Sequence, residues 1–587
     1  MTNRIGRRDL LKGGSAMLVG TLLQDQITDE VKAQTRSPGR NRFRISNYRL
    51  ECKWISKTID GHRVRLRSYN GQVPGPILRT RPGDTLRVHL KNSLPYYDST
   101  GWTGDHNVPH FLNTTNLHVH GLDVIPHLFQ PLGTSNPLAR MIAIEPGRNH
   151  DYTFQIPADH PPGLYWYHSH HHGSTAVQAT SGMAGGIIIH GNIDEVPEIK
   201  AARDIPLVMQ DIALFQSETD DNLWLYEPKQ NAIWQTFGGI VTIYDPTTGK
   251  NNPVKLKAGF STGDYPLHYY LLNGEAFFKE THNPDPNKPT VPIPTQLNPV
   301  ARFTLAPGEV VRFRMLNATS DNLMPIVVEN HPVYLLALDG INFPTVRNIG
   351  IPVDPATPQV LLAPANRAEF LIKANATPGI YRIKQLAQSQ QFLESAEKII
   401  AEIEVKGPAK DMRLPQSLPT QTRYYPLIQP NEVKRVRTIE FSGNFPAVMN
   451  PYVGGDFSIN NALYEETAVP NIVTLGDVEE WQLQVGDSHH GGGEGHPFHI
   501  HVNHFEVISI STAGQPPVMF PPGTIQDTVW VPANSVVTMR TKFKQFVGKA
   551  VYHCHILPHE DTGMMANFLI VPRHSARGAY GNMEKHE

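Results

Sequence analysis

The fold is decided by residues 549–565, KAVYHCHILPHEDTGMM, near the end of a chain of 587 residues. Its first half is a short apolar run carrying a His-x-His pair, which is typical of a β-strand. Successive side chains of a strand point to opposite faces, so His553 and His555 share one face and Cys554 takes the other. The stretch therefore predicts one strand that delivers ligands to two separate sites.

The strand that begins at residue 549 is the last part of a longer unit that occurs three times in the chain. Each copy has a turn leading into a strand, then a proline turn, then a second strand, always in that order. The first segments are 81–86, 306–311 and 475–480, the proline turns are 145–148, 363–366 and 531–534, and the second strands begin at 163–166, 379–382 and 549–552. Repetition of one unit indicates repeated domains. We expect an all-β chain of three β-sandwich domains, at residues 42–195, 196–410 and 411–575, with a C-terminal tail at 576–587.

Composition excludes several classes of protein. Charged residues make up 18% and hydrophobic residues 40%, which excludes a disordered chain and an integral membrane protein. The formal charge of −2 leaves no bulk basic surface for nucleic acid. The 46 glycines and 50 prolines suit a turn-rich β protein, and two cysteines cannot form a disulfide framework. The 28 histidines are the exceptional feature and raise the question of metal binding.

The N-terminus resembles an export signal. Arg7 and Arg8 precede an apolar run at residues 13–23, which is about half the length that a bilayer requires. Paired arginines before a short, mildly apolar segment resemble a twin-arginine signal. Residues 1–33 are therefore expected to direct a periplasmic or secreted protein through the twin-arginine (Tat) machinery, with cleavage after Ala33 and no membrane span.

Four His-x-His pairs stand out, each in a strand-like run. They are His118/His120, His168/His170, His499/His501 and His553/His555. Residues i and i+2 of a strand project from the same face, so each pair aims two imidazoles at one point. Imidazole is a good ligand for copper, zinc or iron.

Cys554 belongs to a second set of ligand types. His559 follows it by five residues, Met564 follows it by ten, and His496 lies in the run 495–501. Thiolate, two imidazoles and a weak thioether are the ligands of a blue-copper electron-transfer site. The same strand is therefore expected to join this site to the His-x-His cluster through a few covalent bonds.

The repeats predict which domains hold metal. Asn503-His504 echoes Asn330-His331, and on that register Ile326 and Val328 replace His499 and His501. The middle domain has then lost its ligands, and we expect a cluster shared between the first and third domains. Because His504 recurs in a domain without ligands, it is interpreted as structural.

With these motifs in place, the chain from about Arg42 to Arg573 resembles a three-domain multicopper oxidase of the bacterial laccase type. The resemblance implies three cupredoxin-like Greek-key domains and four copper ions. It assigns the type 1 copper to His496, Cys554, His559 and Met564, and the type 2 copper to His118 and His499. It assigns the type 3 pair to His120, His168 and His555 on one ion, and to His170, His501 and His553 on the other.

The resemblance also implies an activity. One-electron oxidation of a phenol or another small reductant at the type 1 copper would pass electrons through Cys554 to His553 and His555, and O2 would be reduced to water. Only 14 methionines are present, without a Met-rich insertion, which favours organic donors. The alternatives are an oxidase of cuprous, ferrous or manganous ions, a bilirubin-type oxidase, and an exported cupredoxin scaffold without catalysis.

Oxygen reduction consumes protons, so an acidic group is expected beside the cluster. Glu560 matches an acidic residue that some bacterial relatives use for this purpose. Many members also carry an aspartate shortly after the first motif, but residues 129–144 contain no equivalent, and Asp123 is the alternative. The remaining expectations are that His171 and His172 are not ligands, that Cys52 is a buried free thiol, and that Asp339 and Asp527 are structural rather than catalytic. His489 and His490 either border the substrate entrance or form a solvated turn.

Overall fold

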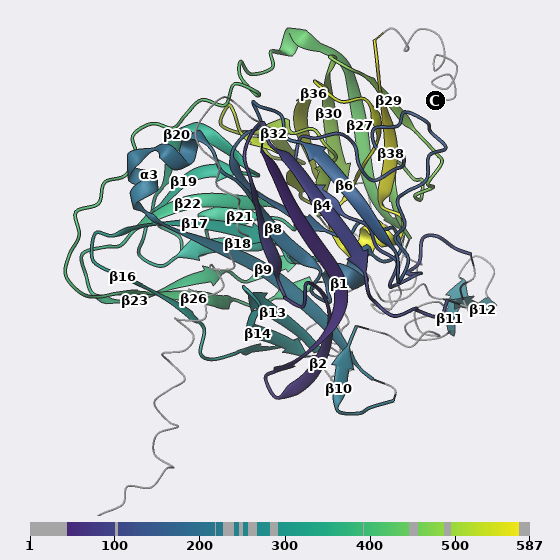
Figure 1. Cartoon of the computed structure of the whole chain (residues 1–587), viewed down its shortest axis with the longest axis horizontal. Coiled ribbons are helices and arrows are strands. Elements are labelled where there is room, and N and C mark those ends of the chain that lie inside the picture. The colour runs from purple at the N-terminus through teal and green to yellow at the C-terminus, as the bar shows by residue number, and fades with distance from the viewer. Residues whose placement is uncertain are drawn as a thin grey trace, which may run out of the picture.

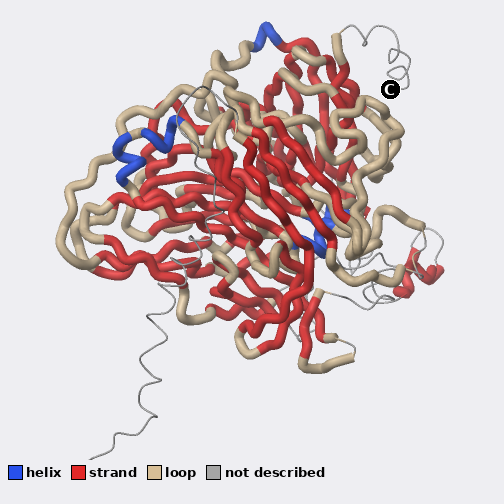
Figure 2. Tube along the Cα trace, viewed as in Figure 1, coloured by secondary structure: helices blue, strands red, loops and turns tan. Residues whose placement is uncertain are grey.

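A computed structural model describes residues 44–99, 102, 104–217, 219–226, 240–245, 250–255, 267–281, 292–390, 393–444, 456–485 and 495–573. The expected export signal, the C-terminal tail, His489 and His490 lie outside this part of the chain. Strands make up most of the described structure, and its helices are single short turns (Figure 2). The all-β expectation is confirmed.

The N-terminal region packs a small sheet against part of a large one. The small sheet has the order β3-β8-β7-β5, formed by Gly75–Thr80, Ala184–Ile189, Gly163–His168 and His118–His120. The facing strands are β2 (His62–Tyr69), β1 (Ile45–Ile59), β4 (Thr85–Asn92) and β6 (Asn149–Gln155). Between the two layers lie the buried side chains of one apolar cluster, which includes Leu117, Val119, Tyr165 and Tyr167.

The large sheet continues from the first domain into the middle one. Beyond β2 it runs through β10 (Leu223–Leu225), β9 (Arg203–Gln216), β17 (Val310–Asn317), β22 (Arg367–Lys373), β19 (Val333–Leu338) and β20 (Ile341–Ile349), and β13 (Leu267–Leu272), β14 (Glu275–Thr281) and β15 (Ile293–Gln296) branch from β9. A five-stranded sheet completes the middle sandwich: β16 (Ala301–Leu305), β26 (Lys398–Val405), β23 (Gly379–Gln385), β18 (Met324–Val328) and β21 (Val360–Leu362). The two domains are thus joined by backbone hydrogen bonds as well as by the chain.

The C-terminal region forms a sandwich of its own, drawn in green and yellow in Figure 1. One sheet contains β28 (Asp456–Ile459), β27 (Val433–Asn444), β30 (Val478–Val485), β36 (Ser535–Lys542), β32 (Phe505–Thr512), β33 (Val518–Met519) and β34 (Ile525–Gln526). The other contains β29 (Asn471–Thr474), β38 (Met565–Val571), β37 (Gly548–Cys554), β31 (His496–Ile500) and β35 (Thr528–Val531). The short helices α2 (Thr175–Ala179) and α5 (Leu557–Asp561) contact each other across the boundary between the first and third domains.

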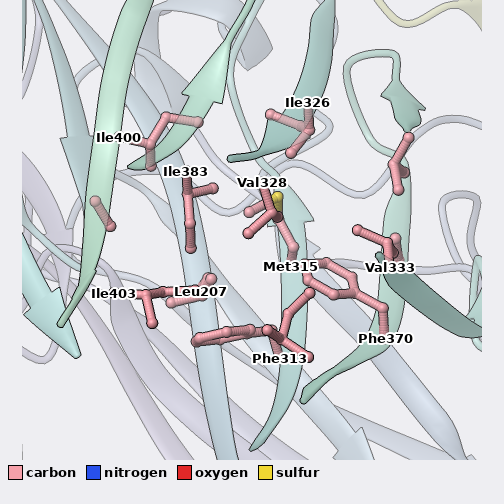
Figure 3. Close-up of a cluster of buried hydrophobic side chains, with 14 of the residues drawn as sticks. Leu207, Phe313, Met315, Ile326, Val328, Val333, Phe370, Ile383, Ile400 and Ile403 are labelled. Atoms are coloured by element: carbon pink, nitrogen blue, oxygen red, sulfur yellow. The ribbon is translucent and has the colours of Figure 1, made fainter. Parts of the chain in front are cut away.

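The register expected for the repeats is wrong by one residue. Ile326 and Val328 point into the core of the middle domain (Figure 3), as Phe498 and Ile500 do in the third. In β18 and β23, Ile326 lies opposite Gln385, and in β31 and β37, Phe498 lies opposite Cys554. The residue matching His499 is therefore Val327, not Ile326. An extra residue, Val502, separates the third domain's histidines from Asn503-His504, so alignment on that dipeptide shifted the register. In the corrected register the middle domain still lacks the histidines, because Val327 and its partner Lys384 occupy the positions of His499 and His553.

Candidate metal centre

Two pairs of adjacent strands carry the histidines. In the first domain His118 of β5 lies opposite His168 of β7, and in the third domain His499 of β31 lies opposite His553 of β37. Alternate residues of these strands, such as Val119 and Ile500, are buried in the cores of their own domains. The histidines therefore project from the opposite face, toward the boundary between the two domains.

All eight His-x-His side chains meet at this boundary, and each is at least 97% buried. The His118 and His501 rings stack with centroids 4.0 Å apart, and the His120 and His499 rings stack at 3.8 Å, so each stack joins the two domains. The Nε2 atom of His553 lies 3.1 Å from His170 Nε2 and 3.4 Å from His501 Nε2. His555 lies near His120 and His168, with ring centroids 5.1 and 5.5 Å away.

The ring nitrogens at the centre suit a metal rather than one another. Atoms without a hydrogen-bond partner include His118 Nε2, His120 Nδ1, His168 Nε2, His499 Nε2 and both nitrogens of His555. Burial lowers the pKa of these histidines, to about 4 for His120 and well below the ordinary value for His168. Neutral imidazoles keep a lone pair, and buried polar atoms rarely stay unpaired without a ligand. The donor set therefore fits bound metal ions.

For His118, His168 and His499, a hydrogen bond on the far side of the ring selects the nitrogen that faces the centre. His118 Nδ1 lies 3.0 Å from His127 Nε2, which also accepts the Val119 N–H, so His118 donates and its Nε2 is left for the centre. His499 Nδ1 lies 2.8 Å from the Asp527 carbonyl, and His168 Nδ1 lies 2.7 Å from the Ser169 carbonyl. Such contacts to the outer nitrogen orient metal-binding histidines. His127 was not predicted from the sequence, because a single histidine carries no spacing signal.

A second site lies on the other face of β37. Cys554 Sγ is 3.4 Å from His496 Nδ1 and 3.8 Å from His559 Nδ1, and those two nitrogens are 3.3 Å apart. Met564 is fully buried in the same apolar cluster as Cys554, and its carbonyl accepts the Cys554 N–H at 3.1 Å. Phe457 stacks on the His559 ring at 3.7 Å, which holds that ring in place. The structure thus brings together the four residues that the sequence grouped here.

Glu560 lies in α5, beside two of the clustered histidines. Its carboxylate oxygens are 3.2 Å from His170 Nδ1 and 3.3 Å from His553 Nδ1, and the side chain is fully buried. Burial, and then the neighbouring Asp561, raise the pKa of Glu560 well above its ordinary value. Asp561 in turn accepts the backbone N–H groups of Gly173 and Ala176, at 2.6 and 2.8 Å. The Glu560 carboxyl is thus positioned to exchange a proton beside the cluster.

The acid beside the first motif is Asp527. It contacts His120 Nε2 at 3.2 Å, whereas Asp123 forms an ion pair with Arg423 and accepts a 3.5 Å bond from Tyr424. Burial alone would raise the pKa of Asp527, but Arg367 and then His120 hold it well below its ordinary value. Asp527 thus contacts a histidine of the first His-x-His pair, which the sequence did not predict, while the Asp123 side chain pairs with Arg423. Asp527 has no motif of its own and lies 407 positions from His120.

The other singled-out residues lie outside the cluster. His172 packs its ring on Tyr464 with centroids 4.5 Å apart, and His171 Nδ1 lies 3.4 Å from Ser174 Oγ. His504 Nε2 lies 3.1 Å from the Asp339 carbonyl, as expected for a structural histidine. Cys52 is a buried free thiol, as predicted.

Three family models, each described as multicopper oxidase, match most of the chain. They cover residues 51–112 with 108–193, residues 244–401, and residues 430–574. The matches thus extend over all three sandwiches, including the middle one. No helix in the described part of the chain is both long and apolar enough to cross a membrane.

Individual proteins give the same result at low identity. A protein named Laccase-4 from Thanatephorus cucumeris is 23% identical over 579 residues, covering 91% of each chain. A multicopper oxidase of Staphylococcus haemolyticus is 22% identical and covers 86% of this chain and 83% of its own. The solved structure of a Campylobacter jejuni multicopper oxidase, described as a metallo-oxidase, superposes with a TM-score of 0.63 at 24% identity, covering 91% of this chain and 93% of its own. The structural match supports three cupredoxin-like domains.

Proposed function

The chain belongs to the multicopper oxidase family, and on that premise we propose that it oxidises phenols or other small organic reductants at a type 1 copper. It is a laccase-like, copper-dependent oxidoreductase with O2 as its electron acceptor. The observation that carries the proposal is the convergence of eight buried histidines, several of which have ring nitrogens without a hydrogen-bond partner. The set of His496, Cys554 and His559 lies on the opposite face of the same strand, β37.

We assign four copper ions to these residues. His496, Cys554, His559 and Met564 would hold the type 1 ion, supported by the short distances around Cys554 Sγ. The type 2 ion would bind His118 and His499, whose Nε2 atoms lack partners. The type 3 ions would bind two sets of three histidines, His120, His168 and His555 on one side and His170, His501 and His553 on the other. We also keep the domain limits 42–195, 196–410 and 411–575 as part of the proposal.

When bound, copper supplies one-electron redox chemistry and reduces O2 to water. The chain provides the connection between the two sites, because Cys554 is joined by single peptide units to His553 and His555. It also separates them, since adjacent residues of β37 point to opposite faces. The organic donor is thereby kept away from the place where O2 reacts.

Glu560 is proposed as the proton relay. Burial and Asp561 raise its pKa, which favours the protonated carboxyl, and either oxygen can then donate a proton toward the space between His170 and His553. Reprotonation of Glu560 after each transfer would then match the proton demand of water formation. Asp527, which is held ionised, is unsuited to donating and instead orients His120.

Export belongs to the same proposal. A twin-arginine signal at residues 1–33 would deliver the folded protein to the periplasm or outside the cell. The mass of the mature protein tests this, because cleavage after Ala33 predicts a chain beginning at Gln34.

Oxygen uptake tests the function. Copper-loaded protein is given a methoxyphenol, with and without added excess copper. Uptake without added copper supports oxidation of organic donors. Uptake only with added copper favours the metallo-oxidase alternative, and no uptake by protein with full copper content favours a scaffold without catalysis.

A further inference from the structure

The middle domain supplies none of the clustered histidines, yet it reaches their site through Arg367. This residue begins β22 and is fully buried. Its Nη1 donates to Asp527 Oδ1 at 2.9 Å and its Nη2 donates to Asp527 Oδ2 at 2.6 Å. A guanidinium that binds both oxygens of a carboxylate fixes its position and its rotation.

Asp527 passes this orientation to a histidine of each outer domain. Its Oδ1 lies 3.2 Å from His120 Nε2, and its carbonyl lies 2.8 Å from His499 Nδ1. Thr528 Oγ1, which donates to Asp527 Oδ1 at 3.0 Å, also lies 3.2 Å from His499 Nδ1. The nitrogens on the other side of these two rings are the ones left unpartnered at the centre.

Further contacts fix the Arg367 side chain and its ion pair with Asp527. Arg367 also donates Nε to the Leu164 carbonyl at 3.2 Å and Nη1 to the Ala365 carbonyl at 3.1 Å. Gly121, at φ +78°, passes so close that a Cβ there would lie 2.4 Å from Arg367 Nη2 and 2.5 Å from Asp527 Oδ2. Glycine therefore follows His120 for a local reason, since a side chain at this position would displace the ion pair.

We propose that Arg367 of the middle domain is a positioning residue for the type 2 and type 3 copper sites, acting through Asp527 on His120 and His499. The inference rests on the proposed ligand assignment. If Arg367 only joined the domains, its carboxylate partner would need no contact with the clustered histidines. That partner, Asp527, contacts one histidine from each outer domain. Loss of the guanidinium removes the two charged donors that orient the Asp527 carboxylate toward His120, leaving the Thr528 hydroxyl on Oδ1 and His504 Nε2 at 3.4 Å from Oδ2.

The test compares two substitutions with a matched control. Arg367→Gln removes the charge, and Arg367→Lys keeps it without the paired donors. Arg312→Gln is the control, because Arg312 is also buried in the middle domain but binds Asp194 and Glu369, at 2.6 and 2.5 Å, instead of Asp527. Each holoprotein is measured for copper per chain, for the type 2 paramagnetic resonance signal, and for the blue type 1 absorption as an internal reference.

We expect Arg367→Gln to weaken retention of type 2 copper by about 10- to 100-fold, the usual effect of removing a contact behind a metal ligand. Arg367→Lys should show a smaller change in the same signal, and type 1 absorption should persist in both. Unchanged type 2 signals in both variants would overturn the proposal. Equal loss of type 1 and type 2 signals, as a folding defect shared with Arg312→Gln would give, would also overturn it. Failure of the ligand assignment itself would appear separately, as a wild-type protein without a type 2 signal.

Discussion

The middle and outer domains can be compared at one matched pair of strand positions. In the first domain this pair is His118 and His168, and in the third it is His499 and His553. In the middle domain the corresponding pair, by strand register, is Val327 opposite Lys384. Lys384 binds Glu329 at 2.8 Å and Glu397 at 3.2 Å, so the equivalent face carries partly exposed ion pairs instead of buried imidazoles.

The apolar cores next to these positions are similar in the middle and third domains, so the two domains differ mainly on the opposite face of the strands. Ile326, Val328 and Ile383 fill the middle core (Figure 3), as Phe498, Ile500 and Tyr552 fill the third. These three positions are apolar or aromatic in both cores, whereas the His499 and His553 positions on the opposite face change their chemistry. A domain can lose the histidines of the shared cluster without losing its fold, because these histidines and the core side chains lie on different faces.

The largest effect is expected from giving the third domain the middle domain's pair. In His499→Val/His553→Lys, oxygen uptake with a methoxyphenol should fall more than about a hundredfold, since direct ligands matter more than the residues behind them. The blue absorption of the Cys554 site should remain, because its ligands lie on the other face. Uptake within tenfold of wild type would refute the assignment of these histidines.

Glu560→Gln keeps every histidine and removes the acidic proton. We expect oxygen uptake to fall by about 10²- to 10⁴-fold, the range for loss of a general acid, with copper content unchanged. Glu480→Gln is the control, since Glu480 only pairs with Arg540 at a partly exposed site. Equal rates for the two variants would exclude Glu560 as the relay.

Met564→Leu tests the other face of β37. A thioether axial ligand should hold the type 1 potential below that of a site without one, so the substitution should raise the potential. Voltammetric titration measures this directly. An unchanged or lower potential would count against Met564 as a ligand.

Lys549→Met should give the smallest effect, on stability. Lys549 Nζ donates to the carbonyls of Pro137, Ala139 and Glu466 at 2.9, 3.0 and 2.5 Å, whereas the matching residue of β23, Ile380, is half exposed. Burial lowers the pKa of Lys549 from 10.5 to about 8. Unpaired carbonyls should destabilise the variant by about 1–3 kcal/mol at pH 7.

The pKa of Lys549 also fixes a pH dependence. Between pH 8 and 10.5 the unfolded chain binds the proton that the folded chain has released, so the contribution of this group to stability rises with pH. The wild type should therefore gain stability relative to Lys549→Met across this range. Thermal unfolding at several pH values measures the gap, and parallel curves would show that Lys549 does not titrate there.

The sequence predicted the strands and their faces well, because alternation relates each His-x-His pair directly to geometry. It also grouped His496, Cys554, His559 and Met564, whose spacing around one cysteine is informative. It missed His127, Asp527 and Arg367, since isolated residues far apart in the chain acquire a role only when three domains pack together. The shared sheet through β9, β10 and β2 was likewise invisible, because strand pairing between domains leaves no local pattern.

The most direct test of the account is the copper content of the holoprotein, measured together with its blue absorption. We predict four copper ions per chain in the wild type, and in His499→Val/His553→Lys a loss of copper from the shared cluster with the blue absorption intact. Equal copper content in the two proteins, or loss of the blue absorption together with the cluster, would contradict the division of ligands between the two faces of β37.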